Sequence, residues 1–116
     1  MSVEDCIFCK IVAGTIPAAR VYEDDTAIAF NDISPQAPTH IVIIPREHIA
    51  SLDEATAEHK DMLGHLLFSA TEIAREKGFA KNGYRVVINT NSDGGQTVFH
   101  LHVHLLAGRP FVFPPG

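Results

Sequence analysis

This sequence of 116 residues is poor in long apolar runs, cysteine and positive charge. No apolar run approaches the roughly 20 residues that a membrane-spanning helix needs, so we expect no membrane segment. Only two cysteines occur, Cys6 and Cys9, which is too few for the disulfide framework of a small secreted protein. The first five residues are polar and acidic and lack the basic region of a signal peptide, so we expect a cytoplasmic protein.

Positive charge is in deficit, with nine Lys and Arg against 14 Asp and Glu and a formal net charge of −5. Binding to nucleic acid needs a basic surface, so this balance argues against a nucleic-acid partner. It leaves room for a small anionic ligand held by local donors. The length predicts one domain over residues 1–116, with a substantial core.

What the sequence does contain is a run of alternating histidines between Val98 and Leu106. Alternation with period two predicts a strand that has one apolar face and one face of imidazoles roughly 6.5–7 Å apart. The apolar face would carry Leu101, Val103 and Leu105, and the opposite face would carry His100, His102 and His104. Three titratable rings on one face are hard to explain by packing, so we interpret them as the functional site.

The strand alone leaves three interpretations of these histidines open. They could be ordinary core or edge residues, although three at alternate positions make that a poor explanation. They could be ligands for Zn, Fe or Mn, because imidazoles two residues apart on a strand suit a metal. They could also serve phosphoryl or nucleotidyl chemistry, with one ring as nucleophile and the others as proton and charge partners.

The rest of the chain predicts an α+β fold, a five-stranded antiparallel sheet with one long and one short helix. The short helix is expected from Cys6 to Ala13, with Asp5 as its cap and Gly14 as its stop. The long helix should begin between Ser51 and Thr56 and end at Lys77-Gly78. Besides the histidine strand, strands are expected at residues 20–23, 27–31, 40–45 and 84–90.

Two further stretches suit a nucleotide ligand. The glycine-rich loop from Asn91 to Thr97 could expose backbone N–H groups to a phosphate, although Asp-Gly-Gly is also simply a good tight turn. Asp32, at the end of a strand, could accept hydrogen bonds from both hydroxyls of a ribose, or it could form a local turn. Neither feature decides between these readings alone.

Cys6 and Cys9 share one helical face and could form half of a zinc site. His48 and one histidine of the triad could complete a Cys2His2 set. The alternatives are two small buried thiols or thioredoxin-like redox chemistry, which lacks the strand that should precede the motif. His59 and His65 fall within the predicted long helix, on its solvated face.

The motif His-Leu-His-Val-His-Leu-Leu at 100–106 resembles that of the histidine triad (HIT) superfamily. Residues 32–40 and 93–96 resemble its nucleotide-binding (HINT) branch in particular. Leu106 favours that branch because the dinucleoside polyphosphate hydrolases of the superfamily have Gln at this position. His104 favours it because the galactose-1-phosphate uridylyltransferases have Gln in place of this third histidine. The similarity extends over essentially the whole chain.

This resemblance implies a homodimeric purine nucleoside phosphoramidase that needs no cofactor for its chemistry. Such an enzyme cleaves purine nucleoside 5′-phosphoramidates and acyl-adenylate-like compounds through a nucleotidyl-histidine intermediate, and releases AMP or GMP. It implies His102 as the nucleophile and His40, His100, His104 and Thr97 as further catalytic residues. The implied nucleotide contacts, besides His102, His104 and Thr97, are Ile7, Phe8, Phe30, Asp32, Ile33, Val42, Asn89, Gly95 and Gln96.

The resemblance also matches Cys6, Cys9, His48 and His100 to the structural zinc ligands of some HIT proteins. Thr97 stands where many relatives have Ser, so leaving-group preference is expected to differ. Phe113 stands where animal relatives have Trp, in a tail that reaches toward the partner's site in that family, so substrate selectivity is expected to differ as well. Two other hypotheses remain: a metal-dependent hydrolase with the triad as ligands, and a binding module without turnover. The histidine strand lacks a suitably placed Glu or Asp to act as base, which counts against the first of these.

Overall fold

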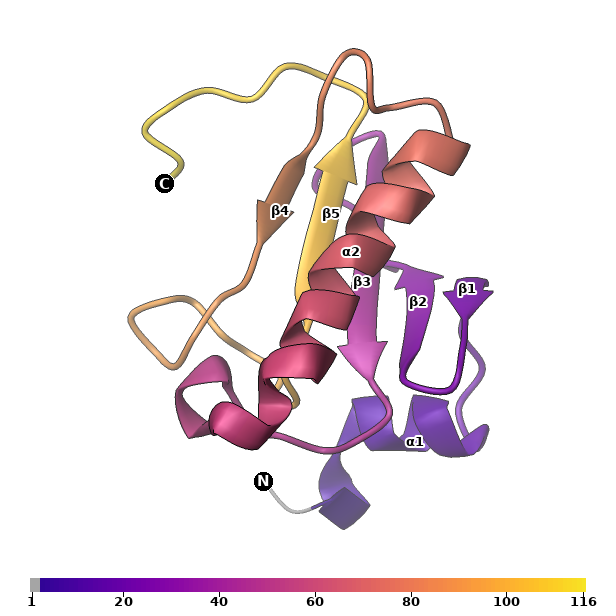
Figure 1. Ribbon diagram of the computed structural model, residues 1–116, viewed down its shortest axis with the longest axis vertical. Helices are drawn as coiled ribbons and strands as arrows, with labels where there is room; N and C mark the ends of the chain where they lie inside the picture. The colour runs from indigo at the N-terminus through magenta and orange to yellow at the C-terminus, as the bar shows by residue number, and fades with distance from the viewer. Residues whose placement is uncertain (1–2) are drawn as a thin grey trace.

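Five antiparallel strands form one sheet, in the order β1-β2-β3-β5-β4, in the computed structural model, which describes residues 3–116 (Figure 1). The strands are β1 (Arg20–Glu23), β2 (Ala27–Asn31), β3 (Thr39–Pro45), β4 (Arg85–Val87) and β5 (Val103–Ala107). The helices are α1 (Ile7–Ala13) and α2 (Lys60–Glu76), with 3-10 turns at Val3–Asp5, Leu52–Glu54 and Ala57–His59. The predicted α+β fold, with five strands, one short helix and one long helix, is confirmed.

The central strand β3 explains why the two faces of the sheet differ. It is almost wholly apolar and pairs with β2 on one side and β5 on the other. Since side chains alternate along a strand, Ile41 and Ile43 face α2, whereas Val42 and Ile44 face α1. Figure 1 shows α2 lying along one face of the sheet, and α1 at the end where β3 finishes.

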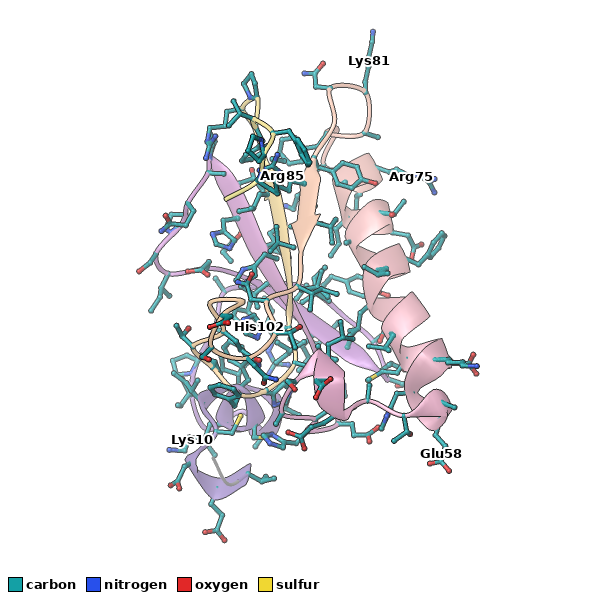
Figure 2. All side chains as sticks on the ribbon, turned by 90° about the vertical axis from the view of Figure 1, so that its left-hand side faces the viewer. Lys10, Glu58, Arg75, Lys81, Arg85 and His102 are labelled. Carbon is teal, nitrogen blue, oxygen red and sulfur yellow. The ribbon has the colours of Figure 1, made fainter. Side chains whose placement is uncertain are left out.

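Burial divides the core between these two faces. The α2 side contains Leu101, Val103 and Leu105, in contact with helix residues such as Leu66 and Ile73. The α1 side is a smaller apolar cluster that includes Phe8, Phe30 and Val42. The predicted division of the histidine stretch is therefore confirmed: its aliphatic residues face α2, whereas His102, which contacts Phe8, and the neighbouring His104 face the other side. Figure 2 shows His102 on the side of the sheet away from α2.

The histidine strand was predicted too long, since β5 begins only at Val103. Residues 98–102 leave the ladder because they bond instead to the segment after β3. The Leu101 N–H donates to the Ile49 carbonyl at 2.7 Å, and the His100 ring bonds to the Pro45 carbonyl at 2.8 Å. The strand predicted at 84–90 is likewise limited to Arg85–Val87, because Val87 pairs with His104 and its partner strand β5 begins only at Val103.

Both helix starts also differ from expectation. Cys6, not Asp5, is the N-cap of α1, and its Sγ accepts a hydrogen bond from the Cys9 N–H at 3.3 Å. The regular part of α2 begins at Lys60, because the chain is extended at Ala55 and Thr56. Thr56 caps the 3-10 turn that leads into α2, and Gly14 ends α1 in the left-handed conformation as expected. Among residues 3–116, no helix is long and apolar enough to cross a membrane.

Candidate functional site

The three triad rings lie on the side of the sheet away from α2, but they do not form an evenly spaced row. The ring centroids of His102 and His104 are 4.9 Å apart, with planes at 75°, closer than the predicted spacing. His102 precedes β5, so its side chain is not constrained by the pleat of the strand. The His100 ring is fully buried and lies against His48, with centroids 5.0 Å apart.

Backbone groups fix the proton positions of His102. Its Nδ1 lies 2.8 Å from the His100 carbonyl, which can only accept, so Nδ1 carries the proton. The lone pair of a neutral His102 is therefore on Nε2. The Phe8 ring packs edge-on against the imidazole, with centroids 5.1 Å apart, and holds its orientation. This is the arrangement that a histidine nucleophile requires.

A second chain of hydrogen bonds fixes the proton positions of His40 and His104. The Gln36 N–H donates to His40 Nδ1 at 3.1 Å, so in neutral His40 the proton is on Nε2. His40 Nε2 lies 2.9 Å from His104 Nδ1 and 3.5 Å from Asp32 Oδ2. The His104 Nδ1 accordingly accepts, and its own N–H is on Nε2, available to an anionic ligand.

Burial keeps these rings neutral at pH 7. It lowers the pKa of His102 and, against the opposing charge of Asp32, that of His40. Burial, together with the neighbouring His102 and His40, lowers the pKa of His104 to about 4. Neutral imidazoles can act as nucleophile and hydrogen-bond donor without prior deprotonation, which suits chemistry near neutral pH.

An apolar cavity of about 310 Å³ lies beside the rings, between α1, β2 and β3. Every apolar side chain that the resemblance implied as a nucleotide contact lines it: Ile7, Phe8, Phe30, Ile33 and Val42. Asp32 lies in the same lining, with its carboxylate 22% exposed. No triad histidine lines this cavity or the larger hollow of about 520 Å³ near Gly78 and Arg109. Phe8 and Asp32 of the apolar cavity, however, contact His102 and His40, so we assign the candidate ligand site to it.

The sequence did not single out several other residues that line this cavity. They are Ile11, Ile16, Pro17, Ala18, Ala19, Asn31 and Val98. The apolar stripe of α1 was a usable signal for Ile11, whereas the segment from Ile16 to Ala19 had none, because it follows the helix in an irregular conformation. Asn89 lies apart from the cavity and lines a smaller hollow with His40 and His104.

The glycine-rich loop is held by its own hydrogen bonds. The N–H groups of Gly95 and Gln96, expected to face a phosphate, donate to Ser92 and Asn91 carbonyls, each at 3.0 Å. The buried Gln96 amide also bonds to the Asn91 N–H and the Ala50 carbonyl. Phosphate binding by these two residues stays a prediction, as does the catalytic role of Thr97, whose side chain is exposed.

Four potential metal ligands converge from separate segments beneath the triad. The donor atoms of Cys6, Cys9, His48 and His100 all lie within 4.8 Å of one another. His48 Nδ1 is 3.2 Å from His100 Nδ1, and the Cys9 sulfur is 3.2 Å from His48 Nδ1. In a tetrahedral zinc site, bond lengths of about 2.05 Å to nitrogen and 2.3 Å to sulfur place neighbouring donors about 3.3–3.8 Å apart. These residues therefore fit zinc.

The surroundings of this cluster support the same assignment. His100 Nε2 bonds to the Pro45 carbonyl, which leaves Nδ1 as the ligand atom. Burial, together with Cys6, raises the pKa of the Cys9 thiol to about 11, an effect that a bound cation would oppose.

A second group of possible ligands consists of Asp32, His40 and His104, whose donor atoms also lie within 4.8 Å of one another. The triad as a whole does not converge on one point, because His100 belongs to the cysteine cluster.

Comparison with known proteins gives a consistent result. The family model for the scavenger mRNA decapping enzyme C-terminal binding region matches residues 5–110. A HIT-like protein of Synechococcus elongatus is 58% identical over 97% of this chain and 98% of its own length. The purine nucleoside phosphoramidase of Escherichia coli is 51% identical over 92% of this chain and 90% of its own.

Solved structures agree with these relatives. A HIT family hydrolase from Legionella pneumophila superposes with a TM-score of 0.95 at 48% identity, covering 97% of this chain and 100% of the other. A zinc-bound histidine triad family protein from Mycobacterium smegmatis superposes with a TM-score of 0.80 at 32% identity, covering 93% of this chain and 78% of the other.

Proposed function

The chain belongs to the histidine triad family, and on that premise we propose that it is a purine nucleoside phosphoramidase. It would hydrolyse purine nucleoside 5′-phosphoramidates, and acyl-adenylate-like compounds, to AMP or GMP. The observation that carries this proposal is the His102 ring, whose Nδ1 is bound to the His100 carbonyl so that the lone pair of the neutral ring lies on Nε2. The similarity to the E. coli enzyme supplies the substrate class.

The substrate's base and ribose are assigned to the apolar cavity. A purine fits its volume of about 310 Å³ and its largely apolar wall, against Phe8 and Phe30. The ribose hydroxyls donate to Asp32 at the rim. The second oxygen of Asp32 accepts from the Ser34 N–H at 2.7 Å, which fixes the carboxylate.

Nucleotidyl transfer then begins at His102. The Nε2 lone pair forms a bond to the α-phosphorus while the P–N bond breaks, and its electron pair passes to the leaving nitrogen. That nitrogen takes a proton from the Thr97 hydroxyl, which is replenished from solvent, and departs as a neutral amine. The His104 Nε2–H donates to a phosphate oxygen and stabilises the negative charge of the transition state.

Water completes the reaction. Its oxygen bonds to phosphorus, the bond from phosphorus to His102 Nε2 breaks, and the imidazole regains its lone pair. The water's surplus proton passes to solvent, and the nucleoside monophosphate is released. The His100 carbonyl keeps the His102 ring in one orientation through both steps, so no rotamer change is needed between them.

We propose structural zinc at Cys6, Cys9, His48 and His100, because their donor spacing fits. When bound, the ion would cross-link α1 to the segment after β3 and to the segment before β5. Its role would be structural rather than that of a Lewis acid in the reaction. His100 would then be fixed at its ring, while its carbonyl orients His102.

We also propose a homodimer in the cytoplasm. The outer edge of β4 carries no strand of the described chain, and Phe68 of α2 is 56% exposed, both of which favour pairing with a second copy. The two free cysteines fit a reducing compartment.

The decisive variant is His102→Ala, assayed with adenosine 5′-phosphoramidate. Turnover should disappear while AMP binding by calorimetry and the circular dichroism spectrum persist, because the cavity does not depend on this ring for its walls. His65→Ala is the control, since His65 lies on α2 and bonds to Asp24. Full activity in His102→Ala would overturn the mechanism. Loss of wild-type activity after chelation, with the fold intact, would favour a metal-dependent hydrolase instead.

A further inference from the structure

The loop between β2 and β3 is held from outside by the start of the C-terminal tail. Arg109 Nη2 donates to the Gln36 carbonyl at 3.1 Å. Gly108, with a φ of 101°, lies so close to Pro38 that a Cβ at this position would be 2.8 Å from the Pro38 Cβ. The tail is therefore fitted against this loop at two adjacent residues.

Gln36 connects this contact to the candidate active site. Its carbonyl accepts from Arg109, while its N–H donates to His40 Nδ1 at 3.1 Å. The other hydrogen bonds given by Ser34 and Gln36 stay within the loop, to Asp32 and to the Ser34 carbonyl. Hydrogen bonds therefore connect four residues in a chain, from Arg109 through Gln36 and His40 to His104.

The guanidinium of Arg109 is itself constrained, although the residue is exposed. It lies over the Phe111 ring, 4.3 Å from the centroid, and Nη1 donates to the Pro110 carbonyl at 3.1 Å. Arg85 approaches the same ring at 5.1 Å, but it bonds to the Val112 carbonyl at 2.6 Å rather than to the loop. The two arginines thus share the tail, and only Arg109 reaches Gln36.

We propose that Arg109 is a positioning residue of the site: through Gln36 it holds His40 in the tautomer and orientation that present Nε2–H to His104. The inference rests on the proposed phosphoramidase function for its effect on turnover. The predicted tautomer and orientation of His40 do not depend on that proposed function. Asp32 should be unaffected, since its N–H bonds directly to the His40 carbonyl at 2.9 Å.

Loss of this contact should alter the protonation of His40. The Gln36 N–H can bond to Nδ1 only while that nitrogen is unprotonated, so it favours the neutral ring. The groups facing His40 are Asp32, which favours the protonated ring, and His104. When Gln36 moves away, the influence of Asp32 grows, and the acid limb of the activity profile should move to higher pH.

The test compares Arg109→Ala, Arg109→Lys and the matched control Arg85→Ala with adenosine 5′-phosphoramidate. For Arg109→Ala we expect kcat to fall about tenfold, within the 100-fold that a misplacement of about 1 Å can cost. AMP affinity and KM should stay within about twofold, and the acid limb should rise by about half a pH unit. Arg109→Lys, or added guanidinium ion, should restore part of kcat. Arg85→Ala should match the wild type.

Histidine ¹⁵N NMR of the same variants reports the His40 tautomer whether or not the protein turns over this substrate. The wild type should show the Nε2–H form, and Arg109→Ala a mixture or a protonated ring. If the wild type is inactive but the tautomer changes, the proposed function fails and the positioning role stands. An unchanged His40 spectrum in Arg109→Ala, or equal losses of kcat in Arg109→Ala and Arg85→Ala, would overturn the proposal.

Discussion

Removal of a bound metal should destabilise this protein by an amount that can be worked out from the cysteine–histidine cluster. The four ligands come from α1, from the segment after β3 and from the segment before β5. The imidazole nitrogens of His48 and His100 already lie 3.2 Å from each other and 3.2–3.5 Å from the Cys9 sulfur. Little rearrangement is needed to bind zinc, so most of the binding free energy should stabilise the native state.

The expected magnitude follows from linkage. Free zinc at about 1,000 times its Kd stabilises the native state by about 4.1 kcal/mol. An unfolding entropy of about 2.1 cal/mol/K per residue gives about 0.24 kcal/mol/K for a chain of 116 residues. The ratio is a rise in Tm of about 17 °C between the chelated and the zinc-loaded protein.

Thermal unfolding by circular dichroism measures this shift directly. Cys9→Ser should lose most of it, while retaining the N-cap bond that Cys6 accepts in α1. Cobalt should bind the wild type in place of zinc and show thiolate charge-transfer absorbance, which Cys9→Ser should weaken. Identical Tm values with and without zinc, or a full shift in Cys9→Ser, would refute the assignment.

Three further predictions concern acid stability, assembly and the glycine-rich loop. The pKa of His104 is about 4 in the folded protein, against about 6.5 when unfolded, so its stabilising contribution is complete above pH 6.5 and is lost as the pH falls toward 4. The urea midpoint should therefore fall over that range, and His104→Asn should flatten the fall; parallel curves for the two proteins would contradict this. Phe68→Glu, which places a charge on an exposed apolar position of α2, should convert a dimer into a folded monomer by analytical ultracentrifugation, and an unchanged mass would exclude that face. Gly94→Ala should impair AMP binding, because its Cβ would clash with the Thr90 backbone; Gly64→Ala, in α2, which meets no neighbouring atom and has no positive φ, is the control, and equal AMP affinity in both would contradict the reasoning.

The sequence predicted the fold because its periodicities are strong. The alternation of apolar residues in β3 and of histidines around β5 determined which face each side chain joins, and both assignments are confirmed. The predicted lengths failed where tertiary hydrogen bonds replace the ladder. Leu101 bonds to Ile49 and the His100 ring to Pro45, and no local pattern could reveal that competition.

The candidate site was predictable in its residue types but not in its connections. The triad, Asp32 and the apolar wall were all identified from motifs, and the structure brings them to one face. The tautomers depend on carbonyl and amide groups of His100 and Gln36, which carry no signal in their side chains. Arg109 has no sequence signal at all, since its role depends on a contact 73 residues away.

The most direct measurement on the central claim is mass spectrometry of protein quenched during turnover of adenosine 5′-phosphoramidate. Nucleophilic attack by His102 requires an adenylyl group on the peptide that contains this residue, present in the wild type and absent from His102→Ala. An active wild type that never carries the group under rapid quenching, or that carries it on another residue, would contradict the mechanism.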